Sequence, residues 1–254
     1  GLILLAWVGT LSANQDSGFI AARQAFQSGN AQRLDEYAPR LKRHVLWPHV
    51  EYYQLRMQLR TADVASIRHF LSRYEGSLVA DRLRSDWLKV LGKNQQWQLF
   101  DKEYPQQVNS DTELLCYAYQ RRLDNGDQQV ITDARSIWNT PTSLPDSCIA
   151  IFQSLIQSGR ISREDLWARI RLALEEGQTG IATQANRYLP GAEGLNAAHL
   201  NSAAKNPLRY LDAQKSLIKS RSDREIALFA LLRLLRNDTD QAYSQWLKVR
   251  NRLT

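Results

Sequence analysis

Two glutamates stand beside aromatic residues and are candidates for acid catalysis. Glu51 is followed by Tyr52 and Tyr53, and Glu103 precedes Tyr104. Glycan cleavage can run on one protonated glutamate or on a pair of carboxylates, and an apolar setting raises the pKa of such an acid. Charged residues are mostly solvent-exposed, however. We therefore expect both glutamates on the solvent faces of amphipathic helices and predict no catalytic residue in this chain.

The four histidines do not suggest a metal site. They are His44, His49, His69 and His199, and no two of them have the His-x-x-x-His or another ordinary zinc spacing. The sequence also contains no glycine-rich phosphate loop and no Gly-x-Ser-x-Gly nucleophile elbow. We therefore predict no metal, no cofactor and no catalytic centre, as in a binding or scaffolding module.

Cys116 and Cys148 are the two cysteines of the chain. An even count suggests a disulfide in an exported protein, whereas two buried free thiols are usual in the cytosol. A bridge would close a loop of about 33 residues and stabilise the fold by about 3–4 kcal/mol through chain entropy. Neither cysteine has a Cys-x-x-Cys or metal-ligand spacing, so neither is predicted to be a nucleophile.

The elements that must position these side chains follow a helical pattern. Apolar residues recur at helical spacing, Asp63 can cap the stripe at 64–74, and glycines separate the stripes. No segment alternates with a period of two, so we predict no strand. The stripes lie at 19–26, 64–74, 80–91, 97–100, 114–123, 130–138, 149–156, 166–174, 226–235 and 242–249, and the expected stops include Gly29, Gly76, Gly92, Gly126, Gly159 and Gly177.

Composition supports the same fold class. Twelve glycines and seven prolines in 254 residues are few for a protein rich in tight β-turns. Helices of about a dozen residues joined by short turns bury their stripes by stacking as hairpins. The tryptophans do not recur at a fixed interval of about 34 residues. We predict an all-α, irregular α-superhelix, a solenoid-like stack of helical hairpins; a compact helical bundle is the alternative.

Basic residues are concentrated towards the C-terminus. The net charge is +7, and residues 201–254 hold eleven Lys or Arg against five Asp or Glu. Such a surface favours anionic partners, whether nucleic acid, anionic lipid or the carboxylate-rich peptides of a bacterial wall. We nevertheless favour a solvated helix face, because Lys and Arg are also good helix formers, and an anionic partner is the alternative.

The first thirteen residues are apolar and uncharged, and polar Asn14, Gln15 and Asp16 follow at once. They are too few to span a bilayer, which takes about 20 residues. They match the apolar core and small-residue end of a secretion signal that lacks its Met and basic start. We expect 1–13 to be the remnant of a signal peptide and 14–254 one helical domain, exported and without a membrane span. A buried N-terminal helix is the alternative.

Several segments resemble the N-terminal superhelical, U-shaped arm of soluble lytic murein transglycosylases. The most specific is the order of Cys116, an Ala-x-x-Leu-Trp-like segment at 134–138, and Cys148. The likeness covers most of 17–190. The other matching segments are 46–52 (Tyr-Pro-hydrophobic-Glu-Tyr-like), 70–74, 80–88, Trp97 with Phe100, 167–173, Gly177 and 205–207.

The resemblance implies a curved α-superhelix in which Cys116 and Cys148 form a disulfide. It also implies that catalysis belongs to a separate, C-terminal lysozyme-like domain. There, a glutamate in a Glu-Ser dipeptide cleaves the bond between N-acetylmuramic acid and N-acetylglucosamine and leaves a 1,6-anhydromuramyl end. This chain has no Glu-Ser dipeptide, and Met57, its single methionine, is not part of the family's Gly-Leu-Met-Gln stretch. The resemblance therefore assigns no catalytic residue here.

We accordingly expect a non-catalytic arm of a periplasmic lytic transglycosylase that positions peptidoglycan glycan strands or other cell-wall enzymes. A stand-alone helical-repeat adaptor, which binds proteins of the cell envelope and no glycan, is the alternative. A nucleic-acid-binding domain would fit the positive charge but not the export signal, so no nucleic-acid partner is predicted.

Overall fold

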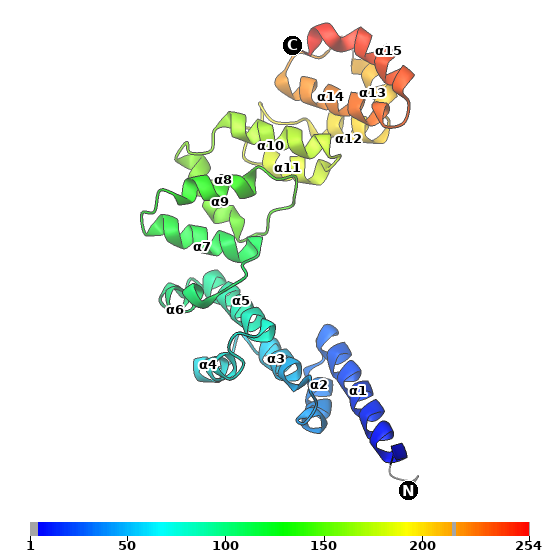
Figure 1. The fold of residues 1–254 in the computed structure, drawn as a ribbon. Coiled ribbons are helices and arrows are strands. Elements are labelled where there is room, and N and C mark those ends of the chain that lie inside the picture. The colour runs from blue at the N-terminus through cyan, green and yellow to red at the C-terminus, as the bar shows by residue number, and fades with distance from the viewer. Residues whose placement is uncertain (1–4, 215–216, 254) are drawn as a thin grey trace. The chain divides into compact units, whose positions relative to one another are not determined.

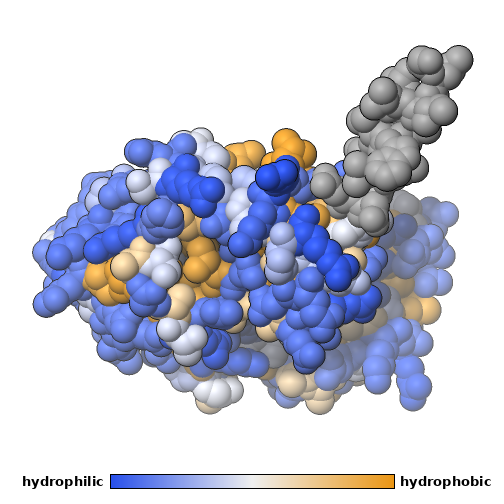
Figure 2. Space-filling model, turned by 90° about the horizontal axis from the view of Figure 1, so that it is seen from below, coloured by the Kyte–Doolittle hydropathy of each residue, from blue (hydrophilic) through white to orange (hydrophobic). Residues whose placement is uncertain are grey.

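The computed structural model describes residues 5–214 and 217–253, and every regular element in these ranges is a helix (Figure 1). The prediction of an all-α chain without strands is therefore confirmed for the described residues. The chain divides into two compact units, residues 1–118 and 119–254. On the face drawn in Figure 2 the surface is mostly hydrophilic, and hydrophobic side chains show in scattered patches.

In the first unit, successive helices pack as hairpins around one apolar core. Helix α1 packs against α2 and α3, α3 packs against α5, and α5 also contacts α4 and α6. The predicted stripe after Asp63 is confirmed, since Ile67, Phe70 and Leu71 are buried. The helices are α1 (Leu5–Gln27), α2 (Ala31–Tyr37), α3 (Trp47–Met57), α4 (Val64–Arg73), α5 (Leu78–Lys93), α6 (Trp97–Glu103) and α7 (Thr112–Asp124), which runs on into the second unit, with 3-10 turns η1 (Ala38–Leu41) and η2 (Tyr104–Gln106).

The second unit repeats this arrangement. Helix α10 packs against α11 and α14, and α12, α13, α14 and α15 contact one another in a cluster. The large side chains Trp138, Phe152 and Phe229 are almost completely buried. The helices are α8 (Val130–Trp138), α9 (Cys148–Gln157), α10 (Arg163–Glu175), α11 (Thr179–Asn186), α12 (Ala197–Lys205), α13 (Pro207–Gln214), α14 (Arg221–Leu235) and α15 (Thr239–Val249), with the 3-10 turn η3 (Arg250–Arg252).

The predicted start and stop signals are confirmed with one exception. The Asp63 carboxylate accepts a hydrogen bond from the Ser66 backbone N–H at 3.0 Å and caps α4. Five of the predicted stop glycines adopt a positive φ, which glycine reaches without the Cβ clash that other residues suffer. These five are Gly29, Gly76, Gly126, Gly159 and Gly177.

Gly92 is the exception, and its prediction as a helix stop is wrong. It lies inside α5, is buried, and has no positive φ; Gln95 takes the left-handed conformation after the helix, with φ 55°. A Cβ at position 92 would lie 2.5 Å from Cγ of Tyr117. Gly92 is therefore required by the close approach of the Tyr117 ring to α5 and not by a turn.

The predicted signal remnant, 1–13, falls partly outside the described residues. Residues 1–4 are not described, and residues 5–13 belong to α1, which continues to Gln27. None of the helices in 5–214 and 217–253 is long and apolar enough to cross a membrane.

Candidate functional site

The two glutamates considered as acids are each engaged by neighbouring side chains. Glu51, on α3, accepts a hydrogen bond from the Tyr74 hydroxyl, and Arg73 lies 3.6 Å from its other oxygen. Burial and this hydrogen bond raise the pKa of Tyr74 to about 12, so the phenol keeps its proton and remains the donor. Glu51 therefore acts as an acceptor in a link between α3 and the end of α4.

The prediction that Glu103, on α6, lies on the solvent face of a helix is wrong. Glu103 is only 5% exposed and does not lie on a solvent face. Arg68 Nε and Nη2 both donate to its Oε1, at 2.9 and 2.8 Å. A charged acceptor can be buried when a cation supplies such hydrogen bonds, which compensate for lost hydration. The pair joins α4 to α6, so the role of Glu103 is structural.

His44 and His49 both lie against the Phe19 ring, with ring centroids 5.7 and 6.5 Å from it, and the other two histidines are on α4 and α12. His44 bonds Asp16 through Nε2 at 3.0 Å and accepts the Leu46 backbone N–H at Nδ1. His199 lies 3.9 Å from Asp223. Across the described residues, no three His, Cys, Asp or Glu side chains are arranged to hold a metal ion.

The two cysteines are bonded to each other in the structure. Cys116 is on α7 and Cys148 begins α9, and both side chains are buried. The disulfide thus links two helices that are separated along the chain by α8.

Arg169, which belongs to the matching segment 167–173, is a buried cation, and the sequence pattern does not predict its burial. It is 1% exposed, and its guanidinium donates to the carbonyls of Trp138, Thr140 and Thr142, with the last two at 2.8 Å. The Trp138 ring lies 4.9 Å beneath Cζ. Burial lowers the pKa of Arg169 to about 10. These hydrogen bonds fix the segment that follows α8, so the role of Arg169 is structural.

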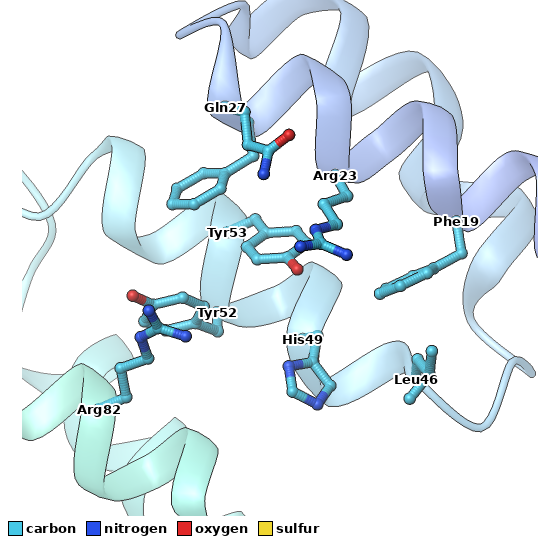
Figure 3. A pocket seen from close by; sticks show the side chains of 9 residues that line it. Phe19, Arg23, Gln27, Leu46, His49, Tyr52, Tyr53 and Arg82 are labelled. Atoms are coloured by element: carbon cyan, nitrogen blue, oxygen red, sulfur yellow. The ribbon is translucent and has the colours of Figure 1, made fainter.

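One concave site of the first unit, a pocket of about 390 Å³ between α1, α3 and α5, combines aromatic and cationic side chains (Figure 3). Helix α1 contributes four side chains at helical spacing, α3 and the residue before it contribute another four, and α5 contributes one. We call this site the aromatic–arginine pocket, and its lining residues are Phe19, Arg23, Phe26, Gln27, Leu46, His49, Tyr52, Tyr53 and Arg82.

Stacked aromatic rings form one wall of the aromatic–arginine pocket. The Phe26 and Tyr53 centroids are 4.4 Å apart with an interplanar angle of 15°, and Phe19 lies 6.4 Å from Tyr53. Tyr52 is fixed by its hydroxyl, which donates to Asp86 at 2.7 Å; burial, followed by this hydrogen bond, raises the pKa of Tyr52. Such a wall offers flat apolar faces at fixed positions.

The polar groups of the aromatic–arginine pocket are cationic or neutral. Arg23 and Arg82 are exposed, and neither has a carboxylate within 4.0 Å among the described residues. The Arg82 guanidinium lies over the Tyr52 ring at 5.8 Å. Figure 3 shows Arg23 reaching towards the Tyr53 hydroxyl. The arrangement can therefore hold a ring against the aromatic wall and an anionic group beside a guanidinium.

The sequence pattern predicts only part of this pocket. The apolar stripe at 19–26 predicts the buried face of one helix, but nothing in the sequence connects Arg23 on that helix with Arg82, which lies 59 positions further along the chain. Their shared surface depends on the packing of three helices, and helical spacing reports only on neighbours within one helix.

Comparisons with known proteins point to one kind of enzyme, although no family model matches the chain. Soluble lytic murein transglycosylase from Escherichia coli K12 is 25% identical over 232 residues, which is 90% of this chain and 35% of the relative. The protein of the same name from Salmonella typhimurium is 23% identical over an equal span. The chain thus spans about a third of the length of these curated relatives.

Solved structures give the same result for the fold. The 70-kDa soluble lytic transglycosylase in complex with bulgecin A matches with a TM-score of 0.66 and 23% identity, over 95% of this chain and 39% of that one. The lytic transglycosylase Slt of Pseudomonas aeruginosa, solved as an inactive mutant, matches with a TM-score of 0.60 and 23% identity over 90% of this chain and 37% of that one. The predicted fold class, a superhelical stack of helical hairpins, is confirmed. This chain is homologous to a segment of the soluble lytic murein transglycosylases.

Proposed function

We propose that this chain is the non-catalytic N-terminal helical arm of a periplasmic soluble lytic transglycosylase. The whole enzyme would cleave the β-1,4 bond between N-acetylmuramic acid and N-acetylglucosamine of peptidoglycan and leave 1,6-anhydromuramyl ends. The observation that carries this proposal is the sequence match to soluble lytic murein transglycosylases over 90% of the chain.

The non-catalytic assignment rests on the residues themselves. The sequence lacks a Glu-Ser dipeptide, and the two glutamates in aromatic settings, Glu51 and Glu103, are engaged by Tyr74 and Arg68. A general acid must present its proton to a bound substrate. Both carboxylates instead accept hydrogen bonds that join helices, which supports a scaffolding role for the segment that carries them.

We assign the arm the role of positioning glycan strands or other cell-wall enzymes around a catalytic domain. The net charge of +7 suits a polymer that bears carboxylates, as do the exposed Arg23 and Arg82, which have no ion-pair partner among the described residues. A periplasmic location is supported by the signal-like residues 1–13 and by the bonded pair Cys116 and Cys148, since disulfides persist in oxidising compartments.

The test combines cosedimentation with product analysis. The chain is incubated with purified sacculi, bound protein is measured against concentration, and released muropeptides are separated by chromatography. Saturable binding without 1,6-anhydromuropeptides is expected. Release of anhydromuropeptides by the chain alone would refute the non-catalytic assignment, and the absence of sacculus binding would refute the glycan-positioning role.

The gene sequence beyond codon 254 tests the parent enzyme independently. A downstream Glu-Ser dipeptide followed by a Gly-Leu-Met-Gln stretch is expected. A stop codon directly after 254 would contradict the arm of a larger enzyme and leave a protein without that catalytic half.

A stand-alone adaptor for cell-envelope proteins is the second candidate, because the second unit carries an exposed apolar groove between α14 and α15. Tyr243 is 61% exposed and Trp246 is 41% exposed, and both line it. Exposed apolar patches of this kind often mark protein contacts. Specific capture of one envelope protein without any sacculus binding would favour this candidate over the arm.

A further inference from the structure

The aromatic–arginine pocket combines features that a structural core does not need. Core aromatics of the first unit, such as Phe70 and Phe100, are 2% and 1% exposed. Phe19 and Phe26, in contrast, are only partly buried and face a cavity of about 390 Å³. This volume lies within the usual range for small-molecule sites. Tyr52 and Tyr53 are 4% and 9% exposed and belong to the core, so the open ring surface of the pocket is that of Phe19 and Phe26.

The polar groups around these rings have unused hydrogen-bonding capacity. Among the described residues, Arg23 and Arg82 have no ion-pair partner, and the Tyr53 hydroxyl has no protein hydrogen bond. Some arginines of the first unit are paired, since Arg56 pairs with Asp86 and Arg68 pairs with Glu103. Others, such as Arg33 and Arg60, have no ion-pair partner among the described residues. What distinguishes the pocket is that its two available guanidiniums and its hydroxyl stand beside partly exposed aromatic rings.

We propose that the aromatic–arginine pocket is a binding site for an acidic sugar of the wall polymer, a pyranose ring that carries a carboxylate. The partly exposed Phe19 and Phe26 rings would contact the apolar C–H face of the sugar. Arg23, beside Tyr53, would bind the carboxylate, because the guanidinium fork matches its two oxygens, and Arg82, over Tyr52, would add positive charge at the other side of the pocket. The Tyr53 hydroxyl and Gln27 amide would bind ring substituents.

This inference rests on the proposed function, which supplies the wall polymer, and it adds the place and the chemistry of recognition. The carboxylate has two sources in peptidoglycan. One is the free lactyl group of a muramyl residue without a stem peptide, and the other is the stem peptide of a complete muropeptide. Both place an anion beside a pyranose, which is the shared chemistry that the pocket fits.

Calorimetric titration of the 254-residue chain tests the site with four soluble probes. These are N-acetylglucosaminyl-N-acetylmuramic acid, the same disaccharide with a tripeptide stem, the stem tripeptide alone, and neutral di-N-acetylchitobiose. At least one acidic sugar is expected to bind about tenfold or more tightly than chitobiose and the free tripeptide, since a charge-assisted hydrogen bond is worth about one to two powers of ten in affinity. Which acidic sugar binds more tightly identifies the source of the carboxylate.

Two charge-matched double variants separate a built site from general attraction. Arg23→Gln with Arg82→Gln removes both pocket cations, whereas Arg33→Gln with Arg60→Gln removes two exposed arginines outside the pocket. The first is expected to weaken acidic-sugar binding about thirtyfold or more, and the control less than about twofold. Tyr53→Phe is expected to weaken it about threefold. Circular dichroism and thermal unfolding confirm that each variant folds.

Several results would overturn the site. An equal loss of acidic-sugar affinity in both double variants would mean non-specific electrostatic attraction. Equal affinity for chitobiose would mean that the pocket does not recognise the anion. Equal affinity for the free tripeptide would mean that it does not recognise the sugar ring. Tight competition by adenosine monophosphate would mean a phosphate-bearing ligand instead. If the chain and the pocket variants bind sacculi equally well, the acidic-sugar site is refuted and the glycan-positioning role of the arm is retained. If the pocket binds acidic sugars but the chain does not bind sacculi, the site is retained and the glycan-positioning role is refuted.

Discussion

Arginine lies over an aromatic ring in both units of this protein, but the two contacts have different consequences. In the first unit Arg82 lies over Tyr52 at 5.8 Å in the aromatic–arginine pocket, and in the second unit Arg169 lies over Trp138 at 4.9 Å in the core. Arg82 is exposed and has no ion-pair partner among the described residues. Arg169 is 1% exposed and donates to three backbone carbonyls.

The difference shows that a cation–π contact does not by itself indicate a role. The contact contributes about 0.5–2 kcal/mol in either setting. What separates the two arginines is the fate of their N–H donors, which serve the fold at Arg169 and remain available at Arg82. Accessible donors without partners mark a candidate binding group, and buried donors bonded to backbone carbonyls mark a structural one.

The largest expected effect on stability comes from replacing the buried arginine, Arg169. Arg169→Met removes the donors to the carbonyls of Trp138, Thr140 and Thr142, and buried acceptors without partners are costly. We expect a loss of about 4 kcal/mol in the free energy of unfolding, measured by urea denaturation. The matched change Arg82→Met is expected to cost less than about 0.5 kcal/mol, as surface changes usually do. Similar losses for the two variants would break the comparison.

Reduction of the disulfide is expected to have the next largest effect. Cys148 lines the same small cavity as Trp138 and Arg169, so the bridge constrains the core around the buried arginine. The chain-entropy model gives a loss of about 3 kcal/mol on reduction. Thermal unfolding with and without a reductant measures it, and a non-reducing gel tests whether the purified protein contains the bridge. Acidic-sugar affinity should not change, because neither cysteine lines the aromatic–arginine pocket.

Changes to the two rings test the comparison at a smaller scale. Trp138→Phe removes an indole N–H that donates to the Asp165 carbonyl at 3.1 Å, and Tyr52→Phe removes a hydroxyl that donates to Asp86 at 2.7 Å. We expect about 2 kcal/mol for the fully buried indole, through the hydrogen bond and lost packing, and about 1 kcal/mol for the phenol. Chemical denaturation measures both. A larger loss of unfolding free energy for Tyr52→Phe than for Trp138→Phe would mean that Tyr52, and not Trp138, is the more important ring for stability.

The smallest expected effect depends on pH. Burial acts to raise the pKa of Asp165, but hydrogen bonds from the backbone and hydroxyl of Ser162 and the charge of Arg135 lower it overall. A carboxyl with a lowered folded-state pKa contributes stability above its unfolded-state value near 3.8, and this contribution is lost as the pH falls through the folded-state pKa.

Asp165→Asn should therefore reduce stability at pH 7 by less than about 1 kcal/mol, and the difference from the unsubstituted chain should shrink below pH 4. Urea denaturation at pH 7, 5 and 3.5 measures this difference. Asp63→Asn, at the exposed cap of α4, should show the same sign, because hydrogen bonds from Ser66 also lower the pKa of Asp63. A difference that grows on acidification would contradict the assigned sign.

The sequence by itself determined the local structure and the fold class. The positive φ at Gly29 and Gly76 and the cap at Asp63 follow from steric and hydrogen-bonding rules that act within a few residues. The amphipathic stripes likewise predicted the helices and their buried faces, because helical periodicity is a local property of the chain.

Only the tertiary structure decided what particular side chains do. Gly92 is needed for the approach of Tyr117, Glu103 is buried because Arg68 meets it from 35 positions away, and Arg169 bonds carbonyls about 30 positions before it. The physical reason is the same each time. The partner that decides a polar side chain's role belongs to another helix, and which helix comes within hydrogen-bonding distance depends on how the hairpins pack.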